Sequence, residues 1–263
     1  MIRSLKDLYG HTILAKDGEI GKVHDFYFDD KHWTVRYLVA DTGGWLTGRL
    51  VLLSPVALGQ PDWGARAFPV SLTRQQIEDS PSADSDLPVS RQHEAELHRY
   101  YGWPMYWGGG MGAAGILAMY PELVVEPRPR AEETLAADEE TVNREQGDPH
   151  LRSTRAVTGY HIQATDGQIG HVEDFLADDG WAIRYVVADT RNWLPGKAGL
   201  LSPAWIDQVS WDDRKVYVDL PREKIRHAPE FDASVPVSRQ SEEALFDHYG
   251  RPGYWSKTPA KRT

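Results

Sequence analysis

The chain has 263 residues, 41% of them hydrophobic and 26% charged, which predicts a soluble globular protein of one large or two small domains. It has no cysteine, so disulfides, thiolate nucleophiles and cysteine-ligated metal centres are excluded. The formal charge of −10 disfavours direct contact with a nucleic-acid backbone.

The sequence offers no segment of the length that a membrane anchor needs. The N-terminal residues lack the apolar run of a secretory signal. The most apolar stretch, 108–119, is shorter than the ~20 residues of a spanning helix and begins with three glycines. We therefore expect a cytoplasmic protein without membrane insertion.

Short strands followed by short helices are expected over the first hundred or so residues. A strand around 20–26 is interrupted by Gly21, as at a β-bulge or a close backbone approach. The run TVRYLVA at 34–40 is β-branched and aromatic, which is typical of a central strand. Further strands are expected at 50–53, 56–58 and 67–70, and helices at 73–77 and from the N-cap Ser90. This spacing favours a small antiparallel barrel.

An acidic segment of low complexity follows at 108–149. It contains nine acidic residues against three basic ones. Such a composition cannot bury enough apolar surface to offset the entropy of ordering it, so we expect a flexible linker. The alternative is an acidic docking segment for a partner.

The pattern of the first hundred residues then recurs. DGEIGKVHDF at 17–26 matches DGQIGHVEDF at 166–175, and WTVRYLVADT at 33–42 matches WAIRYVVADT at 181–190. The offset is 149 residues at first and 148 after one loop residue is lost, and it holds up to the last Tyr-Trp pair. This indicates a tandem duplication. We expect a first repeat at 1–107, a second repeat at 150–255 and a basic tail at 256–263.

The repeated motifs resemble those of the PRC-barrel family. They are DG-x-IG-x-V-x-DF, RY-x-VADT, WL-x-G and LLSP, and the closing PVSRQ and Tyr-Trp motifs are similar to the tail of free-standing bacterial members. The family is named for the cytoplasmic domain of the photosynthetic reaction-centre H subunit and also occurs in a ribosome-maturation factor. The resemblance implies a mainly β fold of two tandem small antiparallel PRC-type β-barrels, each with short C-terminal helices.

Four carboxylates are candidates for a metal site or a proton route, the latter because the reaction-centre subunit helps carry protons toward a quinone. They are Asp25 and Asp41 in the first repeat and Asp174 and Asp189 in the second. The alternative is that they lie near strand ends and fix turns through side-chain hydrogen bonds. The histidines offer no ligand set common to both repeats, and no catalytic residue, metal site or cofactor is expected.

Aromatic and arginine side chains are the candidates for structural or interface roles. Trp33 and Trp181 are expected in the core, where burial would stabilise the fold. Arg36 and Arg184 are expected to pair with a carboxylate such as Asp25 or Asp174 and to lie along aromatic rings; the alternative is an anionic ligand.

The Tyr-Trp pairs that close each repeat are the remaining candidates. Tyr106 and Trp107 in the first repeat, and Tyr254 and Trp255 in the second, either pack on their own barrel or cross to the other barrel or to a partner.

The resemblance implies a non-enzymatic interaction or adaptor protein that binds another protein or a membrane-associated complex. Two alternatives are a small-ligand or metal-binding protein that uses its Asp-rich loops, and a ribosome-assembly-related protein-binding factor. We also expect the two repeats to pack as an intramolecular pseudo-dimer. A homo-oligomer is compatible with this interpretation.

Overall fold

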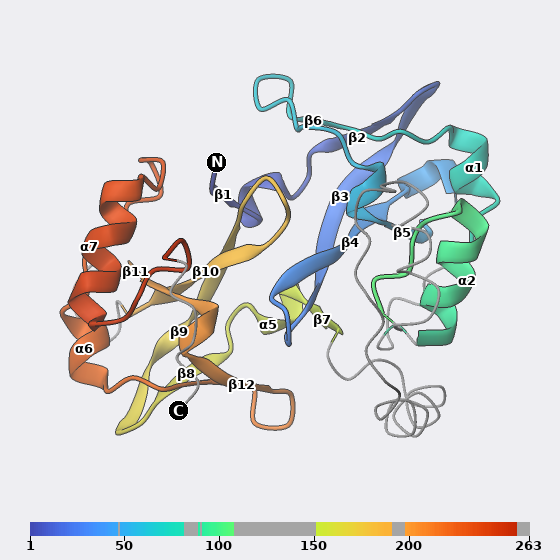
Figure 1. Ribbon diagram of the computed structural model, residues 1–263. Coiled ribbons are helices and arrows are strands. Elements are labelled where there is room, and N and C mark those ends of the chain that lie inside the picture. The colour runs from blue at the N-terminus through green and yellow to red at the C-terminus, as the bar shows by residue number, and fades with distance from the viewer. Residues whose placement is uncertain (47, 82–88, 90, 108–150, 191–197, 257–263) are drawn as a thin grey trace, which may run out of the picture. The chain divides into compact units, whose positions relative to one another are not determined.

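The computed structural model describes residues 1–46, 48–81, 89, 91–107, 151–190 and 198–256 (Figure 1). The predicted linker, the expected N-cap Ser90 and all of the predicted basic tail except Ser256 lie outside the described residues.

The described strands pair in two sheets (Figure 1). One sheet has the order β5-β4-β3-β2-β6, with β7 paired to β3, and the other has the order β11-β10-β9-β8-β13-β12, with β1 paired to β9. The strands are β1 (Arg3–Ser4), β2 (Thr12–Ala15), β3 (Gly18–Asp29), β4 (Thr34–Asp41), β5 (Leu50–Leu53), β6 (Ala67–Pro69), β7 (Leu151–Ser153), β8 (His161–Ala164), β9 (Gly167–Ala177), β10 (Ile183–Asp189), β11 (Ala198–Leu201), β12 (Ile206–Ser210) and β13 (Lys215–Val218). The expected mainly β class is confirmed, and the strand order of each sheet is an open path rather than a closed ring within the described chain.

The described helices are short, as expected. They are α1 (Arg74–Glu78), α2 (Arg91–Tyr101), α5 (Thr154–Val157), α6 (Arg222–Arg226) and α7 (Arg239–Tyr249). Thr73 caps α1 and Ser238 caps α7, each by accepting a hydrogen bond from the amide three residues on. The strand expected at 56–58 is instead a 3-10 turn at Pro55–Ala57, because Ser54 caps the turn and Pro55 favours its first position.

Each sheet contains one glycine that allows a close backbone approach. In β3, a Cβ atom on Gly21 would lie 2.0 Å from the carbonyl oxygen of Asp41, and the backbone there has φ +143°. In β9, Gly170 has φ +90°, and a Cβ atom would lie 2.1 Å from the carbonyl oxygen of Asp189. The expected interruption at Gly21 is therefore a close approach, and it accompanies a register shift between β2 and β3.

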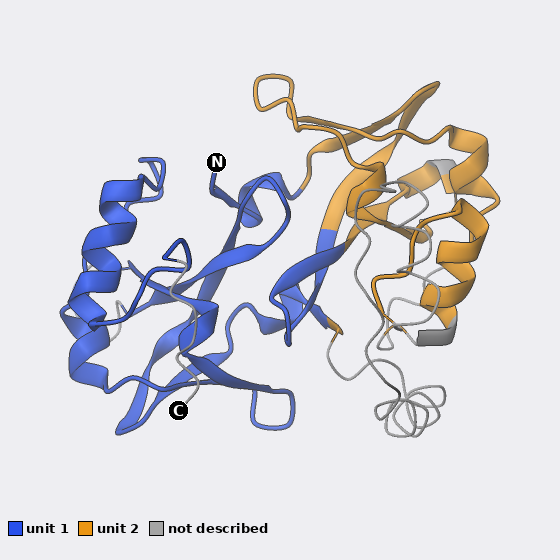
Figure 2. Ribbon diagram, viewed as in Figure 1, with its two compact units in different colours: residues 1–9, 25–36, 152–263 blue, residues 10–24, 37–151 orange. Residues whose placement is uncertain are grey.

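The chain divides into two compact units (Figure 2). Unit 1 contains residues 1–9, 25–36 and 152–263, and unit 2 contains residues 10–24 and 37–151. The division cuts β3 after His24 and β4 after Arg36, so part of the first repeat is grouped with the second. The domain boundaries expected from the sequence stay a prediction.

Each unit has a core of fully buried aliphatic and aromatic side chains. In unit 2 the largest are Tyr37 and Phe68, together with Ile13, Ile20, Leu38, Leu52 and Leu53. In unit 1 they are Phe26, Phe28, Phe175 and Tyr185, together with Leu5. In unit 1 the helix α7 packs on this core, since the ring of Phe246 lies edge-on to that of Tyr185 at 6.5 Å.

A substitution of Gly170 should test the close approach in β9. We expect Gly170→Ala to lower the free energy of unfolding by ~2–4 kcal/mol, because its Cβ atom would overlap a backbone carbonyl at a positive φ. Gly199→Ala in β11 is the control, because its Cβ atom would meet no atom within 4 Å. Urea unfolding followed by tryptophan fluorescence measures both variants, and equal midpoints would contradict this explanation.

Candidate functional site

Asp25 accepts hydrogen bonds from the start of α5, although the two are more than a hundred residues apart in the chain. The side chain lies within β3, not at its end, and is 5% exposed. It accepts hydrogen bonds from the Thr154 hydroxyl at 2.8 Å, from the Arg155 amide at 3.1 Å and from the Ser153 hydroxyl. All of these residues belong to unit 1. The carboxylate therefore caps a short helix.

Asp174 has the matching position in β9 and matching donors. It accepts hydrogen bonds from the Ser4 hydroxyl at 2.5 Å and from the Lys6 amide at 3.1 Å. Burial raises the pKa of Asp174 to about 6, against the hydrogen bonds from Ser4, Phe175 and Lys6 that lower it. Both aspartates thus bind segments that are distant in the sequence, and both lie inside strands rather than at the strand ends expected from the sequence.

Asp41 and Asp189 do lie at strand ends, where β4 and β10 finish. Asp41 accepts a hydrogen bond from the amide of Gly43 at 2.8 Å, which fixes the turn after β4. Asp189 is 5% exposed, and its carboxylate lies 3.6 Å from Nε2 of His171. Asp41 therefore has the role of the alternative drawn from the sequence, in which an aspartate at a strand end fixes a turn.

Arg36 and Arg184 pair with aspartates other than those named from the sequence. Arg36 donates to Asp29 at 2.9 Å, and Arg184 lies 2.6 Å from the carboxylate of Asp178. The expected partners Asp25 and Asp174 are instead occupied by the hydroxyls and amides described above. Burial of Asp29 disfavours its ionised form, but hydrogen bonds from Arg36 and His32 outweigh burial and lower its pKa.

Trp33 and Trp181 are only partly buried, so the expectation of core tryptophans is wrong. Both have a positive φ, +50° and +65°, which is a strained conformation for a bulky residue. The ring of Trp33 stacks on Phe28 at 5.4 Å, and the ring of Trp181 lies 5.8 Å from Phe26. Each indole therefore covers a buried phenylalanine rather than entering the core itself.

The closing Tyr-Trp pairs contact helices of their own repeat. The Tyr106 hydroxyl donates a hydrogen bond to Glu94 of α2, and the ring of Trp107 lies edge-on to that of His98, with 5.0 Å between the ring centroids. In the second repeat, Tyr254 donates to Glu242 of α7 at 2.7 Å, and Trp255 lies edge-on to Phe246 at 5.0 Å. Of the two alternatives drawn from the sequence, these contacts favour packing on the same repeat.

Two buried glutamates form hydrogen-bond centres that the sequence did not reveal. Glu94 and Glu242 are 0% and 4% exposed. Each accepts a second hydrogen bond at 2.8 Å from a core tyrosine, Tyr37 for Glu94 and Tyr185 for Glu242. The sequence does contain a glutamate at the matching position of both helices. A glutamate in the first helical turn, however, usually indicates a helix start that is exposed to water.

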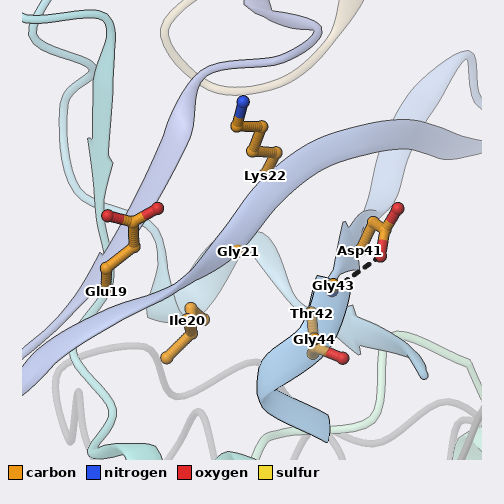
Figure 3. Close-up of a pocket in the computed structure, with 8 residues that line it drawn as sticks. All are labelled: Glu19, Ile20, Gly21, Lys22, Asp41, Thr42, Gly43 and Gly44. Carbon is orange, nitrogen blue, oxygen red and sulfur yellow. Dashed lines mark hydrogen bonds between the residues drawn. The ribbon is translucent and has the colours of Figure 1, made fainter. Parts of the chain in front are cut away.

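A cavity of about 350 Å³ lies in unit 2, beside the turn that Asp41 fixes (Figure 3). Its lining comes from β3 and from the end of β4 with the turn that follows, and consists of Glu19, Ile20, Gly21, Lys22, Asp41, Thr42, Gly43 and Gly44. Glu19, Lys22 and Asp41 are its charged side chains. Among the residues that the structure describes, no group of three or more histidine or acidic side chains is arranged to hold a metal ion. None of the described helices combines the length and apolar character needed to cross a bilayer.

The raised pKa of Asp174 predicts a pH dependence of stability. The folded state binds this proton more tightly than the unfolded chain, where the value is 3.8, so the stabilising contribution is full below pH 3.8 and is lost as pH rises through 6. Relative to Asp174→Asn, we expect the free energy of unfolding of the natural protein to fall by ~2–3 kcal/mol between pH 4 and 6.5.

Urea titrations at each pH measure this change. Asp166→Asn serves as the control, because hydrogen bonding from the Arg222 amide lowers the pKa of Asp166 and the loss of that carboxylate should leave the fall in place. Identical pH profiles for the natural protein and Asp174→Asn would show that burial does not control this carboxyl.

The comparisons with known proteins agree with the motifs of the first repeat. The family model described as the PRC-barrel domain matches residues 2–64. That range includes β1 to β5, the candidate residues Asp25, Trp33, Arg36 and Asp41, and the close approach at Gly21. Comparison with curated proteins gives no match. Over residues 2–64 this chain is therefore similar to the PRC-barrel domain.

Proposed function

We propose that this protein is a non-enzymatic interaction module that binds another protein through both of its repeats. A PRC-barrel domain suggests a protein-interaction role, and the match at residues 2–64 supports that role for the first repeat. The second repeat, which has the same motifs at a constant offset, is proposed as a second PRC-type barrel.

The observation that carries the proposal is a pair of half-exposed tryptophans at matching positions. Trp63 precedes β6 and Trp211 precedes β13, and they are 39% and 40% exposed. Each is held by an edge-on aromatic ring, His11 at 5.6 Å for Trp63 and Tyr160 at 6.1 Å for Trp211. Large, ordered aromatic side chains of this kind are the usual anchors of protein–protein interfaces.

The chemistry of the acidic residues supports a binding role over a metal-dependent one. Where β3 ends and the Asp-rich turn begins, Asp29 is paired with Arg36, and Asp30 is paired with Arg152 at 2.9 Å. These cations already neutralise the carboxylates that a metal ion would need, which argues against a metal site at these aspartates.

The proposal is tested by purifying the tagged full-length protein from its native cells, with detergent and nuclease treatment, and identifying what is retained by mass spectrometry. We expect a stoichiometric protein partner that binds again when both proteins are purified. Membrane-associated and ribosomal partners are separated by the identity of the retained protein.

Tryptophan variants connect the binding to the proposed surface. We expect Trp63→Ala with Trp211→Ala to weaken binding of the purified partner by roughly 30-fold or more, measured by calorimetry. Val56→Ala with Val235→Ala is the control, because those side chains are 63% and 58% exposed and lie outside the proposed anchors. Absence of a partner above background, or equal binding by the tryptophan variant, would overturn the proposal.

A further inference from the structure

Several of the contacts that join residues 1–9 and 25–36 to the chain from Arg152 onward occur in matched pairs. Ser153 donates to Asp25, and at the offset of 149 residues Ser4 donates to Asp174. The Arg155 amide donates to Asp25 at 3.1 Å, and the Lys6 amide donates to Asp174 at 3.1 Å. All of these residues lie within unit 1.

The backbone pairing repeats in the same reciprocal way. The short strand β1 pairs with β9 of the second repeat, and β7 pairs with β3 of the first. A bridge joins Thr34 to Ala182. Around it, the Val35 amide donates to the Trp181 carbonyl at 2.9 Å and the Ile183 amide donates to the Trp33 carbonyl at 2.7 Å. The positive φ of each tryptophan occurs at the residue whose carbonyl accepts one of these bonds.

Aromatic side chains form the apolar part of the same region. Phe28 lies 5.2 Å from Phe175, and Phe26 lies 5.8 Å from Trp181, measured between ring centroids. The three phenylalanines are at most 1% exposed. Leu5 is also buried, and its amide donates to the carbonyl of Phe175 at 2.9 Å.

We propose that these segments form a pseudo-twofold junction, which is a homodimer-type interface closed within one chain. In a twofold interface the same surface is used on both sides, so that a contact from i to j is matched by a contact from j to i. The serine and amide hydrogen bonds to Asp25 and Asp174 meet this requirement at an offset of 149 residues. The backbone bonds accepted by the Trp33 and Trp181 carbonyls meet it at an offset of 148. The second repeat is the partner that this surface of the first repeat fits. The inference does not rest on the proposed function.

The junction holds the two repeats together without the connecting segment 108–149. Separation would expose Phe26, Phe28 and Phe175 to water, and this is opposed by the hydrophobic effect. It would also remove the side-chain and α5 donors from Asp25, so its carboxylate would have to be solvated again.

Cleavage of the connection tests this proposal on the folded full-length protein. A recognition site for a sequence-specific protease is introduced within 108–149, and the protein is cleaved after purification. We expect the two fragments to elute together and to appear as a 1:1 complex in native mass spectrometry at micromolar concentration. Dissociation into two separate fragments would overturn the proposal.

An engineered disulfide tests the register of the junction and does not depend on binding strength. Thr34 and Ala182 lie opposite each other in an antiparallel bridge whose hydrogen bonds are made by the neighbouring residues. In antiparallel strands, such non-hydrogen-bonded pairs have the shortest Cα–Cα distances. The chain has no cysteine of its own. We expect Thr34→Cys with Ala182→Cys to cross-link on mild oxidation, so that the cleaved fragments migrate together in a denaturing gel without reductant.

Thr34→Cys with Gln208→Cys is the matched control. Gln208 is an exposed residue of β12, and β12 is at the opposite end of its sheet's strand order from β10 and β11. Equal cross-linking of both pairs, or none for Thr34 with Ala182, would contradict the proposed register.

Aspartate variants test the reciprocal hydrogen bonds. We expect Asp25→Ala with Asp174→Ala to weaken the association of the cleaved fragments roughly 100-fold, because both sets of capping bonds are lost. Asp17→Ala with Asp166→Ala is the control. Those aspartates cap helices within their own repeats, accepting from the amides of Arg74 and Arg222, so their loss should leave the association unchanged. Equal effects of the two pairs would overturn the assignment of Asp25 and Asp174 to the junction.

Discussion

Much of unit 1 depends on one constraint, which is that two aspartates inside β-strands need hydrogen-bond donors for their carboxylates. A carboxylate removed from water is costly unless hydrogen-bond donors replace its hydration. Asp25 and Asp174 receive theirs from short segments that begin a turn or helix, Ser153–Arg155 and Ser4–Lys6. Because these donors are far away in sequence, β1 and β7 must run beside β9 and β3 for the bonds to form. This is why the compact unit includes residues from both ends of the chain.

The same need for compensation explains the other buried charges. Arg36 neutralises Asp29, the last residue of β3, and Arg184 neutralises Asp178, which directly follows β9. Glu94 and Glu242 each accept, on Oε1, hydrogen bonds from two tyrosine hydroxyls, one from the sheet and one from the closing Tyr-Trp segment. A hydroxyl can donate to a carboxylate without adding charge, so helix and sheet can pack closely around it. The polar network therefore positions α2 and α7.

The two helices achieve this arrangement with different neighbours. In α2 the position after the buried Leu97 is His98, whose Nε2 lies 2.8 Å from the Tyr37 hydroxyl. In α7 the matching position is Phe246, whose ring lies edge-on to Trp255 at 5.0 Å. The geometry of the tyrosines and the glutamate is common to both helices, while the groups around it have diverged.

The sequence by itself determined the mainly β class, the repeated motifs, the central strand β4, the strand β5 and the interruption of β3 at Gly21. These features depend on local composition and on a constant offset, which can be counted along the chain. Only the tertiary structure decided which groups meet. Asp29 and Asp178, rather than Asp25 and Asp174, receive the arginines, since pairing depends on which donors the fold brings close to each carboxylate. The buried role of Glu94 and Glu242 was likewise not predictable from their positions, because a glutamate at a helix start has the same sequence pattern whether water or a tyrosine hydroxyl solvates it.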